Sequence, residues 1–292
     1  MRTLSIIGKR NMNGCRLLVG FYLSILGVAS SACSVVMDGD RVQCKTDSDC
    51  TIRGPEYAGA VCSDSMCRPD PTWSCLDDST PEEIPSGTVH VKLSAQDLLS
   101  QKPVAGIHLT LCAKLDADCV RPIAAFQSDD AGQLDVELPV GFDGYFQTEG
   151  SGIYPTLFFP PNTRKQRAPG TLPMVPESFF GTMFSGIGAT VSSDRTVIMT
   201  TALDCMGRPA AGMILTTNQA DDRSVTYFLQ GGLPSRTALT TDQDGAGGFV
   251  NIKMGGAIVT SMIAASSRVA GTVGVQTRAG HLTMVLVTPT GG

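Results

Sequence analysis

The chain has 292 residues, of which 17% are charged and 42% are hydrophobic, with 27 acidic against 22 basic side chains. Nucleic-acid binding depends on neutralisation of phosphates by Lys and Arg, so an acidic chain argues against that class of function. The one local basic group, Arg164-Lys165-Arg167, lies in a proline-rich stretch and predicts a solvated linker.

The N-terminus has the layout of a secretory signal. Residues 1–16 carry four basic side chains and no acid, an apolar run follows over Leu17–Leu26, and small residues come next. This order predicts export, with residues 1–32 as the signal peptide. After its removal 18 basic and 27 acidic side chains remain, a net charge of about −9.

The small residues end at Cys33, in the order Leu-Gly-Val-Ala-Ser-Ser-Ala-Cys. This ending resembles the lipobox of bacterial lipoproteins, although Ser30 stands where that family prefers leucine. The resemblance implies an acylated Cys33 and a lipid anchor in the bacterial envelope, at the outer membrane or cell surface. Two alternatives stay open: ordinary cleavage after Ala32, and an uncleaved anchor over residues 17–37, which hold about the 20 uncharged residues that span a bilayer.

The number of cysteines favours the lipid. Of ten cysteines, Cys15 leaves with the signal, and nine is an odd number for an exported chain. Lipid attachment at Cys33 leaves eight, which can form four disulfides in an oxidising compartment. The eight are Cys44, Cys50, Cys62, Cys67, Cys75, Cys112, Cys119 and Cys205.

Residues 33–43 are expected to form an anchor segment, and residues 44–75 a cysteine-rich module with few large apolar side chains. Cross-links must replace a core in so small a segment. The spacing contains no C-x-x-C pair, so no metal site is predicted. Residues 76–86 are acidic, contain two prolines and predict a linker.

Beyond this linker the chain is patterned as β-strands. Apolar residues alternate with polar ones in three runs: Val89, Val91 and Leu93; Ile107, Leu109 and Leu111; Leu134, Val136 and Leu138. Alternation of period two is typical of antiparallel sheets with one buried face. We expect a β-domain over 87–160, a linker with a short helix near Pro176 over 161–189, and a second β-domain over 190–292.

The second β-region repeats the first. The segment Lys102–Ile107 returns as Arg208–Met213, and the turn Ser128–Gly132 returns as Thr241–Gly245. Two independent motifs in the same order indicate a tandem duplication.

These motifs resemble those of the carboxypeptidase regulatory-like, or transthyretin-like, domain, which pairs P-x-x-G with a T-D-x-x-G turn. The resemblance implies an all-β fold, with two tandem transthyretin-like β-sandwiches preceded by a small disulfide-rich module. The acids Asp129 and Asp242 can cap the turns, and Gly132 and Gly245 supply a positive φ.

The disulfides can be assigned as hypotheses. Cys112 and Cys119 flank a hairpin loop, and their bond would contribute about 2.5 kcal/mol by the chain-entropy estimate. Four of the five clustered cysteines are expected to pair within their module. Cys75 then remains for Cys205, in a bond worth up to about 5 kcal/mol.

No catalytic chemistry is predicted. His90, His108 and His281 fall on the polar phase of alternating strands, and no known nucleophile or zinc motif occurs. One transthyretin-fold family hydrolyses a purine-derived substrate, but it ends in Tyr-Arg-Gly-Ser, whereas this chain ends in Thr-Pro-Thr-Gly-Gly. A periplasmic hydrolase is the least favoured interpretation, and neither a cofactor nor a metal is expected.

The first β-domain concentrates aromatic residues within an 18-residue stretch. If exposed, Tyr145, Phe146, Tyr154 and Phe158 would form a platform for a ligand; if packed, they are core, which the pattern favours. The expected function is a non-catalytic, lipid-anchored envelope protein that serves as an interaction or display module, with an envelope protein or glycan as partner. The alternative is binding of carbohydrate or peptidoglycan.

Overall fold

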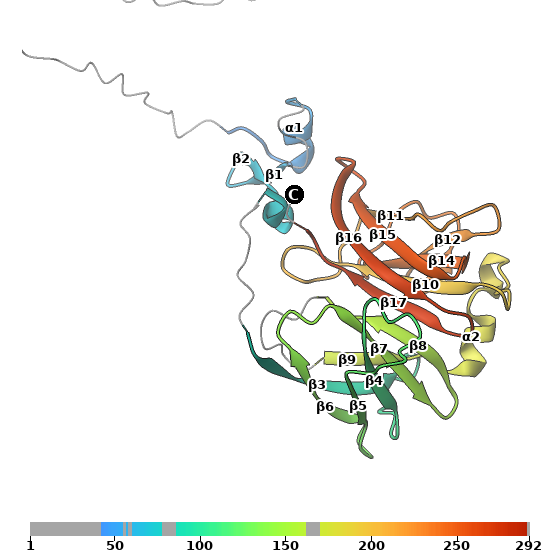
Figure 1. Ribbon diagram of the computed structural model, residues 1–292. Helices are drawn as coiled ribbons and strands as arrows, with labels where there is room; N and C mark the ends of the chain where they lie inside the picture. The colour runs from blue at the N-terminus through green and yellow to red at the C-terminus, as the bar shows by residue number, and fades with distance from the viewer. Residues whose placement is uncertain (1–41, 55–56, 58–59, 78–85, 162–169, 291–292) are drawn as a thin grey trace, which may run out of the picture. The chain divides into compact units, whose positions relative to one another are not determined.

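The computed structural model describes residues 42–290 apart from 55–56, 58–59, 78–85 and 162–169. The signal peptide and Cys33 lie outside the described residues. The fold is all-β with a small disulfide-containing module at its start, which confirms the predicted class (Figure 1).

The cysteine-rich module is built around sulfur. It contains helix α1 (Asp47–Thr51), the hairpin of β1 (Ala60–Ser63) and β2 (Met66–Pro69), and a 3-10 helix, η2 (Pro71–Asp77). Cys44, Cys50 and Ala60 form its small core. Disulfides therefore take the place of an apolar interior, as expected for a segment of this size.

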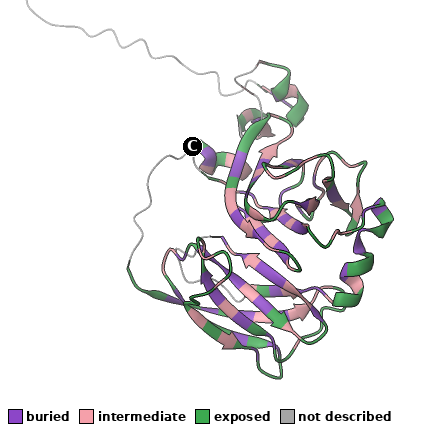
Figure 2. Ribbon diagram, turned by 45° about the vertical axis from the view of Figure 1, so that its right-hand side comes forward, coloured by how far each residue is buried: buried purple, intermediate pink, exposed green. Residues whose placement is uncertain are grey.

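The first sandwich packs a three-stranded sheet, in the order β6-β3-β9, against β8-β7-β4-β5. The strands are β3 (Thr88–Asp97), β4 (His108–Ala113), β5 (Ala124–Gln127), β6 (Gln133–Pro139), β7 (Gly144–Gly150), β8 (Ile153–Phe159) and β9 (Gly170–Met174). The alternating residues of β3 and β6 enter the core, which Figure 2 shows as purple bands along the strands.

The stretch expected to be a linker differs from expectation. It carries β9, which pairs in parallel with β3 and buries Leu172 and Met174 in the first core. After Pro176 it forms the expected short helix, α2 (Glu177–Met183), followed by a 3-10 turn, η3 (Ser185–Ile187).

The second sandwich packs a sheet of order β11-β15-β16 against β13-β12-β14-β10-β17. Its strands are β10 (Thr196–Ala202), β11 (Met213–Thr217), β12 (Val225–Gln230), β13 (Leu233–Ser235), β14 (Ala246–Ile252), β15 (Gly255–Ile263), β16 (Arg268–Thr277) and β17 (Leu282–Val287).

One sheet runs through both sandwiches. The last strand, β17, pairs in parallel with β10 on one side and with β8 of the first sandwich on the other, from Leu282 opposite Thr156 to Val285 opposite Phe159. The result is a nine-stranded sheet, β13-β12-β14-β10-β17-β8-β7-β4-β5. The two sandwiches are therefore fused by backbone hydrogen bonds.

The repeated turns make the same contacts in both sandwiches. The Ala95 amide donates to Gly132 O at 2.8 Å, and the Ala202 amide donates to Gly245 O at 2.9 Å. The two glycines have φ of 73° and 63°. A side chain at Gly132 would place Cβ 2.8 Å from the carbonyl oxygen of Ala95, and one at Gly245 would place it 2.7 Å from that of Ala202. Glycine is thus required twice, for its positive φ and for the close approach.

The buried hydroxyl of the turn is also equivalent. Ser128 Oγ accepts from the Ile107 amide at 2.9 Å, and Thr241 Oγ1 accepts from the Met213 amide at 3.0 Å. Each hydroxyl also donates to a carbonyl of its P-x-x-G loop, at 3.1 and 2.7 Å. Serine therefore replaces threonine in the first copy without loss of a hydrogen bond.

The two faces of the nine-stranded sheet are covered by different elements. On one face Ile198, Phe249 and Val285 pack under the sheet β11-β15-β16, together with Tyr145 and Leu157 from the first sandwich. On the opposite face of the β12-β14-β10-β17 part, a separate cluster forms with α2 and η3. Its members include Phe180, Phe184, Val197, Tyr227 and Leu282.

Candidate interaction surface

The aromatic residues of the first sandwich are packed, as the pattern favoured, and do not form the alternative exposed platform. Tyr145 and Phe146 are 0% and 2% exposed, because β7 is covered on both faces. Tyr154 stacks on Phe180 with ring centroids 3.7 Å apart, and the half-buried Phe158 stacks on Phe146 at 6.1 Å. Tyr145 and Phe146 are core and Tyr154 and Phe158 are half-buried, so none of the four rings is exposed as a sugar-binding platform would require.

The histidines do not form a catalytic arrangement. His90 and His108 are exposed, as expected, and His90 Nδ1 lies 3.7 Å from an Asp135 carboxylate oxygen. His281 is half-buried with Nδ1 2.9 Å from Ala279 O. In the described part of the chain, no histidine hydrogen bonds to a hydroxyl or thiol that could act as a nucleophile.

All eight described cysteines are in disulfides. The bonds are Cys44–Cys62, Cys50–Cys67, Cys75–Cys205 and Cys112–Cys119. The last two join the cysteines that the sequence analysis paired. The sulfurs of Cys44, Cys50 and Cys67 lie within 4.8 Å of one another, but each is bonded to another sulfur and offers no thiolate to a metal.

The end of the cysteine-rich module is docked on the second sandwich. The Cys75–Cys205 bond joins residues 130 positions apart, and the Cys205 amide donates to Thr72 O at 3.0 Å. Leu76 is buried in the core of the second sandwich, and Trp73, the only tryptophan of the chain, packs against it. Trp73 therefore reports on this contact.

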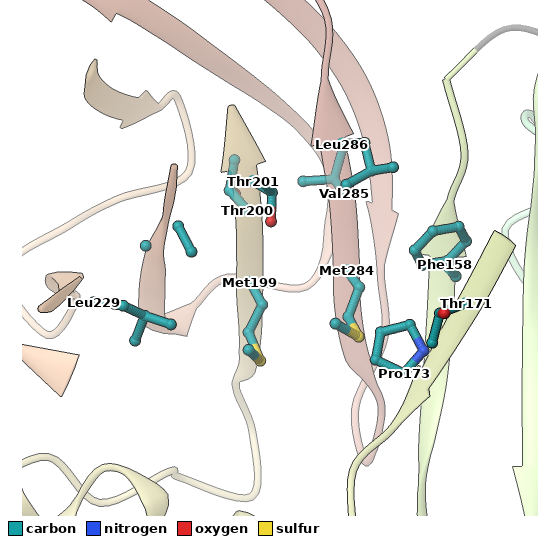
Figure 3. Close-up of a pocket in the computed structure, with 12 residues that line it drawn as sticks. Phe158, Thr171, Pro173, Met199, Thr200, Thr201, Leu229, Met284, Val285 and Leu286 are labelled. Carbon is teal, nitrogen blue, oxygen red and sulfur yellow. The ribbon is translucent and has the colours of Figure 1, made fainter. Parts of the chain in front are cut away.

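An apolar groove of about 190 Å³ lies on the outer face of the nine-stranded sheet, where the two sandwiches meet. In Figure 3 the side chains of Met199 and Met284 lie side by side, between Leu229 on one side and Phe158 and Pro173 on the other. The full lining is Phe158, Thr171, Pro173, Met199, Thr200, Thr201, Leu229, Ala246, Gly247, Met284, Val285 and Leu286. No lining residue is charged.

The groove was not predicted from the sequence, because its walls come from strands that are distant in the chain. The signal that could have indicated it is the composition of β10 and β17. Met199 and Met284 occupy the phase opposite to Ile198 and Val285, so both strands are apolar on both faces. Such strands are typical of sheets that are covered on two sides.

A second apolar feature is the loop that follows β4, which we call the disulfide loop (residues 113–123). Leu115 is 91% exposed, Val120 76% and Ile123 49%. The Cys112–Cys119 bond closes the base of this loop. Large aliphatic side chains are thus held in solvent on a cross-linked turn.

Hydrogen bonds within the disulfide loop fix its shape. The Asp116 carboxylate accepts from the Arg121 amide at 2.8 Å and from the Val120 amide at 3.0 Å. These bonds, above all that from Arg121, lower the pKa of Asp116 below its ordinary value. The Tyr145 hydroxyl donates to Asp116 O at 2.6 Å. Hydrogen bonds therefore hold both the side-chain carboxylate and the main-chain carbonyl of Asp116.

Arg278 of the second sandwich also holds the loop. Its guanidinium donates to Ala117 O, and to the Tyr145 hydroxyl at 3.1 Å. Its Nε lies 3.7 Å from Asp118, and Lys114 Nζ lies 2.9 Å from Asp143. Lys114 and Asp118 are consequently paired with opposite charges, Arg121 is exposed, and Leu115 and Val120 are the most exposed apolar side chains of the tip.

No family model matches this chain, and no curated protein matches it. Similarities to solved structures are low. A streptococcal ancillary pilin shares 13% identity at a TM-score of 0.21, with 70% of this chain and 69% of that chain covered. The shaft pilin SpaA of Lactobacillus rhamnosus GG shares 11% at 0.23, with 71% and 99% covered. BcpA, the major pilin subunit of Bacillus cereus, shares 12% at 0.22, with 69% of each chain covered. TM-scores this low do not indicate a shared fold.

Helices in the described part of the chain are short: none has the length and apolar character needed to cross a membrane.

Proposed function

We propose that the chain is a non-catalytic exported protein, lipid-anchored through Cys33 in the bacterial envelope, that acts as an interaction or display module at the cell surface. The observation that carries this proposal is the pairing of the cysteines. All eight described cysteines are bonded to one another, so none of them is left as a partner for Cys33. Disulfides persist in oxidising compartments, in agreement with export, and acylation accounts for the remaining cysteine.

An interaction role is supported by the surface. The uncharged groove and the exposed side chains of the disulfide loop are apolar features on rigid elements. Contiguous exposed apolar surface marks interaction sites and ligand-binding grooves. The described histidines, by contrast, form no hydrogen bond with a hydroxyl or thiol that could act as a nucleophile.

The family resemblance is part of the same proposal. We infer that each sandwich is a transthyretin-like domain. The support is that Gly132 and Gly245, with their neighbouring hydroxyls at Ser128 and Thr241, make the same hydrogen bonds in both copies.

The anchor is tested by expressing the full chain in a Gram-negative host fed with labelled palmitate. We expect the label on the protein, and its loss in a Cys33→Ser variant. Cys15→Ser is the matched control, because Cys15 leaves with the signal, and it should label normally. An unlabelled wild-type protein, released in soluble form, would contradict the anchor.

The interaction role is tested by capture from envelope extract with the mature chain as bait, beside a panel of glycans and peptidoglycan fragments. We expect an envelope protein that is retained by wild type and lost on Leu115→Asp, with Leu239→Asp as the control for an exposed leucine, 81% exposed, elsewhere. Binding to the glycan panel alone would favour the carbohydrate alternative. Retention of nothing by either arm would contradict an interaction role.

A further inference from the structure

The chain carries two apolar features that complement each other. The disulfide loop projects Leu115 and Val120 into solvent, and the groove offers an apolar cavity of about 190 Å³. Leu115 and Val120 are exposed, whereas Met199, Leu229 and Met284 are half-buried against the cluster around α2 and leave the cavity beside it unfilled. A projecting apolar side chain and a preformed apolar pocket on the same molecule form the two halves of a contact.

The two halves lie on opposite faces of the nine-stranded sheet. Arg278, at the end of β16, holds the disulfide loop by way of Tyr145, whose ring enters the core beneath the sheet β11-β15-β16. Met199 and Met284, which line the groove, alternate along their strands with Ile198 and Val285, which enter that same core. A loop on one face cannot reach the groove on the other, so the contact must join two molecules.

The electrostatics allow two copies of an acidic chain to meet here. No residue that lines the groove is charged. In the loop, Lys114 is paired with Asp143 and Asp118 with Arg278, and hydrogen bonds from amides hold the Asp116 carboxylate. The loop also carries the exposed Arg121, so its two basic and two acidic side chains cancel, and the two surfaces that would touch carry no net charge.

The loop is also rigid before any contact forms. The Cys112–Cys119 bond and the hydrogen bonds from Val120 and Arg121 to Asp116 fix the direction of Leu115. A binding element that is already ordered loses less conformational entropy on association. The apolar side chains at the tip would leave water when they enter the groove.

We propose that the disulfide loop of one copy inserts Leu115 and Val120 into the Met199–Met284 groove of a second copy. Because the two surfaces differ, the contact is heterologous and joins copies head to tail into rings or open chains. This inference rests on the proposed interaction function, and it identifies the partner as a second copy of the chain.

The test uses the full chain in the envelope of a producing cell, with the photo-crosslinking residue p-benzoyl-phenylalanine in place of Leu115. The matched control carries the same residue in place of Leu239, which is 81% exposed on the segment after β13. We expect light-dependent products at multiples of the chain mass from position 115 only. Peptides linked to position 115 should contain Met199 or Met284.

A second variant keeps the probe and removes the contact. With the probe at Val120 and the substitution Leu115→Asp, the yield of linked copies should fall roughly tenfold or more. Leu115 is 91% exposed, so this substitution leaves the fold intact.

Three results would overturn the inference: no linked copies from position 115, linked copies whose peptides lie outside the groove, or equal yields from positions 115 and 239. Links to a different envelope protein would also overturn it, but would leave the proposed interaction function standing. Failure of that function is recognised separately, by the capture experiment above.

Discussion

The two sandwiches share their turns but differ on their outer faces. If Ala95 and Ala202 are taken as equivalent, because each donates to its turn glycine, Lys92 of β3 corresponds to Met199 of β10. Lys92 is exposed to solvent, whereas Met199 is half-buried in the groove. The two sandwiches thus agree where the backbone is crowded, and they differ on the face that the turn does not constrain.

The last strands of the two sandwiches also differ, and this difference explains how the sandwiches are fused. In each sandwich the last strand pairs in parallel with the first strand: β9 pairs with β3, and β17 pairs with β10. The strand β9, which contains Pro173, ends its sheet, as an edge strand with proline does. The strand β17 instead continues into β8. The groove exists because the sheet of the second sandwich continues into the first sandwich of the same molecule.

The Cys75–Cys205 disulfide should contribute more to stability than the shorter Cys112–Cys119 disulfide. The double variant Cys75→Ser, Cys205→Ser should lower the free energy of unfolding by up to about 5 kcal/mol, because this bond closes the longer loop. The double variant Cys112→Ser, Cys119→Ser should cost about 2.5 kcal/mol. Denaturant unfolding measures both. Emission of Trp73 should shift to the red only in the first variant, since Trp73 packs at that junction.

Equal losses in the two double variants would show that the closing of the longer loop is not what stabilises the docked module. An unshifted Trp73 emission after loss of the Cys75–Cys205 bond would show that η2 stays docked without it.

The shared turns should respond alike to an added methyl group. Gly132→Ala and Gly245→Ala should each cost about 2–3 kcal/mol, because each combines a positive φ with a contact on a carbonyl oxygen. Gly207→Ala is the matched control, with φ of 75° and nothing near its Cβ, and should cost about 1 kcal/mol. Thermal or denaturant unfolding gives these values. A control as costly as the turn variants would refute the close approach as the cause.

The outer faces should respond to different degrees when their residues are exchanged. Met199→Lys places a charge among the apolar side chains of the groove and should destabilise by about 1–2 kcal/mol. Lys92→Met, on the equivalent strand, should change stability by no more than about 0.5 kcal/mol. Denaturant unfolding of both variants compares the faces, and equal changes would contradict their divergence.

The smallest effect concerns acid. Asp97 and Asp204 occupy equivalent turns. The Ser100 amide is the main cause that lowers the pKa of Asp97. Burial raises the pKa of Asp204, but the hydrogen bonds from Arg208 and the Met206 amide outweigh burial and leave the pKa lowered. A carboxylate whose pKa is lower in the folded than in the unfolded state stabilises the fold at pH values above the unfolded pKa, near 3.8. This stabilisation is lost as the pH falls below that value.

Stability should therefore decline as pH falls below about 4, and the decline should be shallower in Asp97→Asn and in Asp204→Asn. Denaturant midpoints from pH 6 to pH 2 measure it. A decline that is as steep in both variants as in wild type would exclude these carboxylates as its source.

The sequence predicted the features that depend on residues close together in the chain. Alternation in Val89–Leu93 located β3, and the repeated turns located equivalent positions in the two sandwiches. It failed where long-range pairing decides. Gly170–Met174 contains glycine and proline and looks like a linker, yet it becomes β9 because β3 offers a free edge and a core for Leu172. The parallel pairing of β17 with β8 has no local signal.

Burial of the aromatic stretch, which the pattern favoured, also depends on long-range pairing. Tyr145 and Phe146 are adjacent in the chain, so on an ordinary strand one of them would face solvent. Both are buried because elements of both sandwiches cover β7. The groove at the junction of the sandwiches likewise depends on the fused sheet.

Hydrogen–deuterium exchange of the mature protein tests whether one sheet runs through both sandwiches. The relevant amides are those of β8 (Ile153–Phe159) and β17 (Leu282–Val287), which pair with each other at the junction. We predict that they exchange as slowly as those of the central strand β14 (Ala246–Ile252). Exchange as fast as in the edge strands β5 and β13 would contradict the fusion, and with it the groove that the two sandwiches build together.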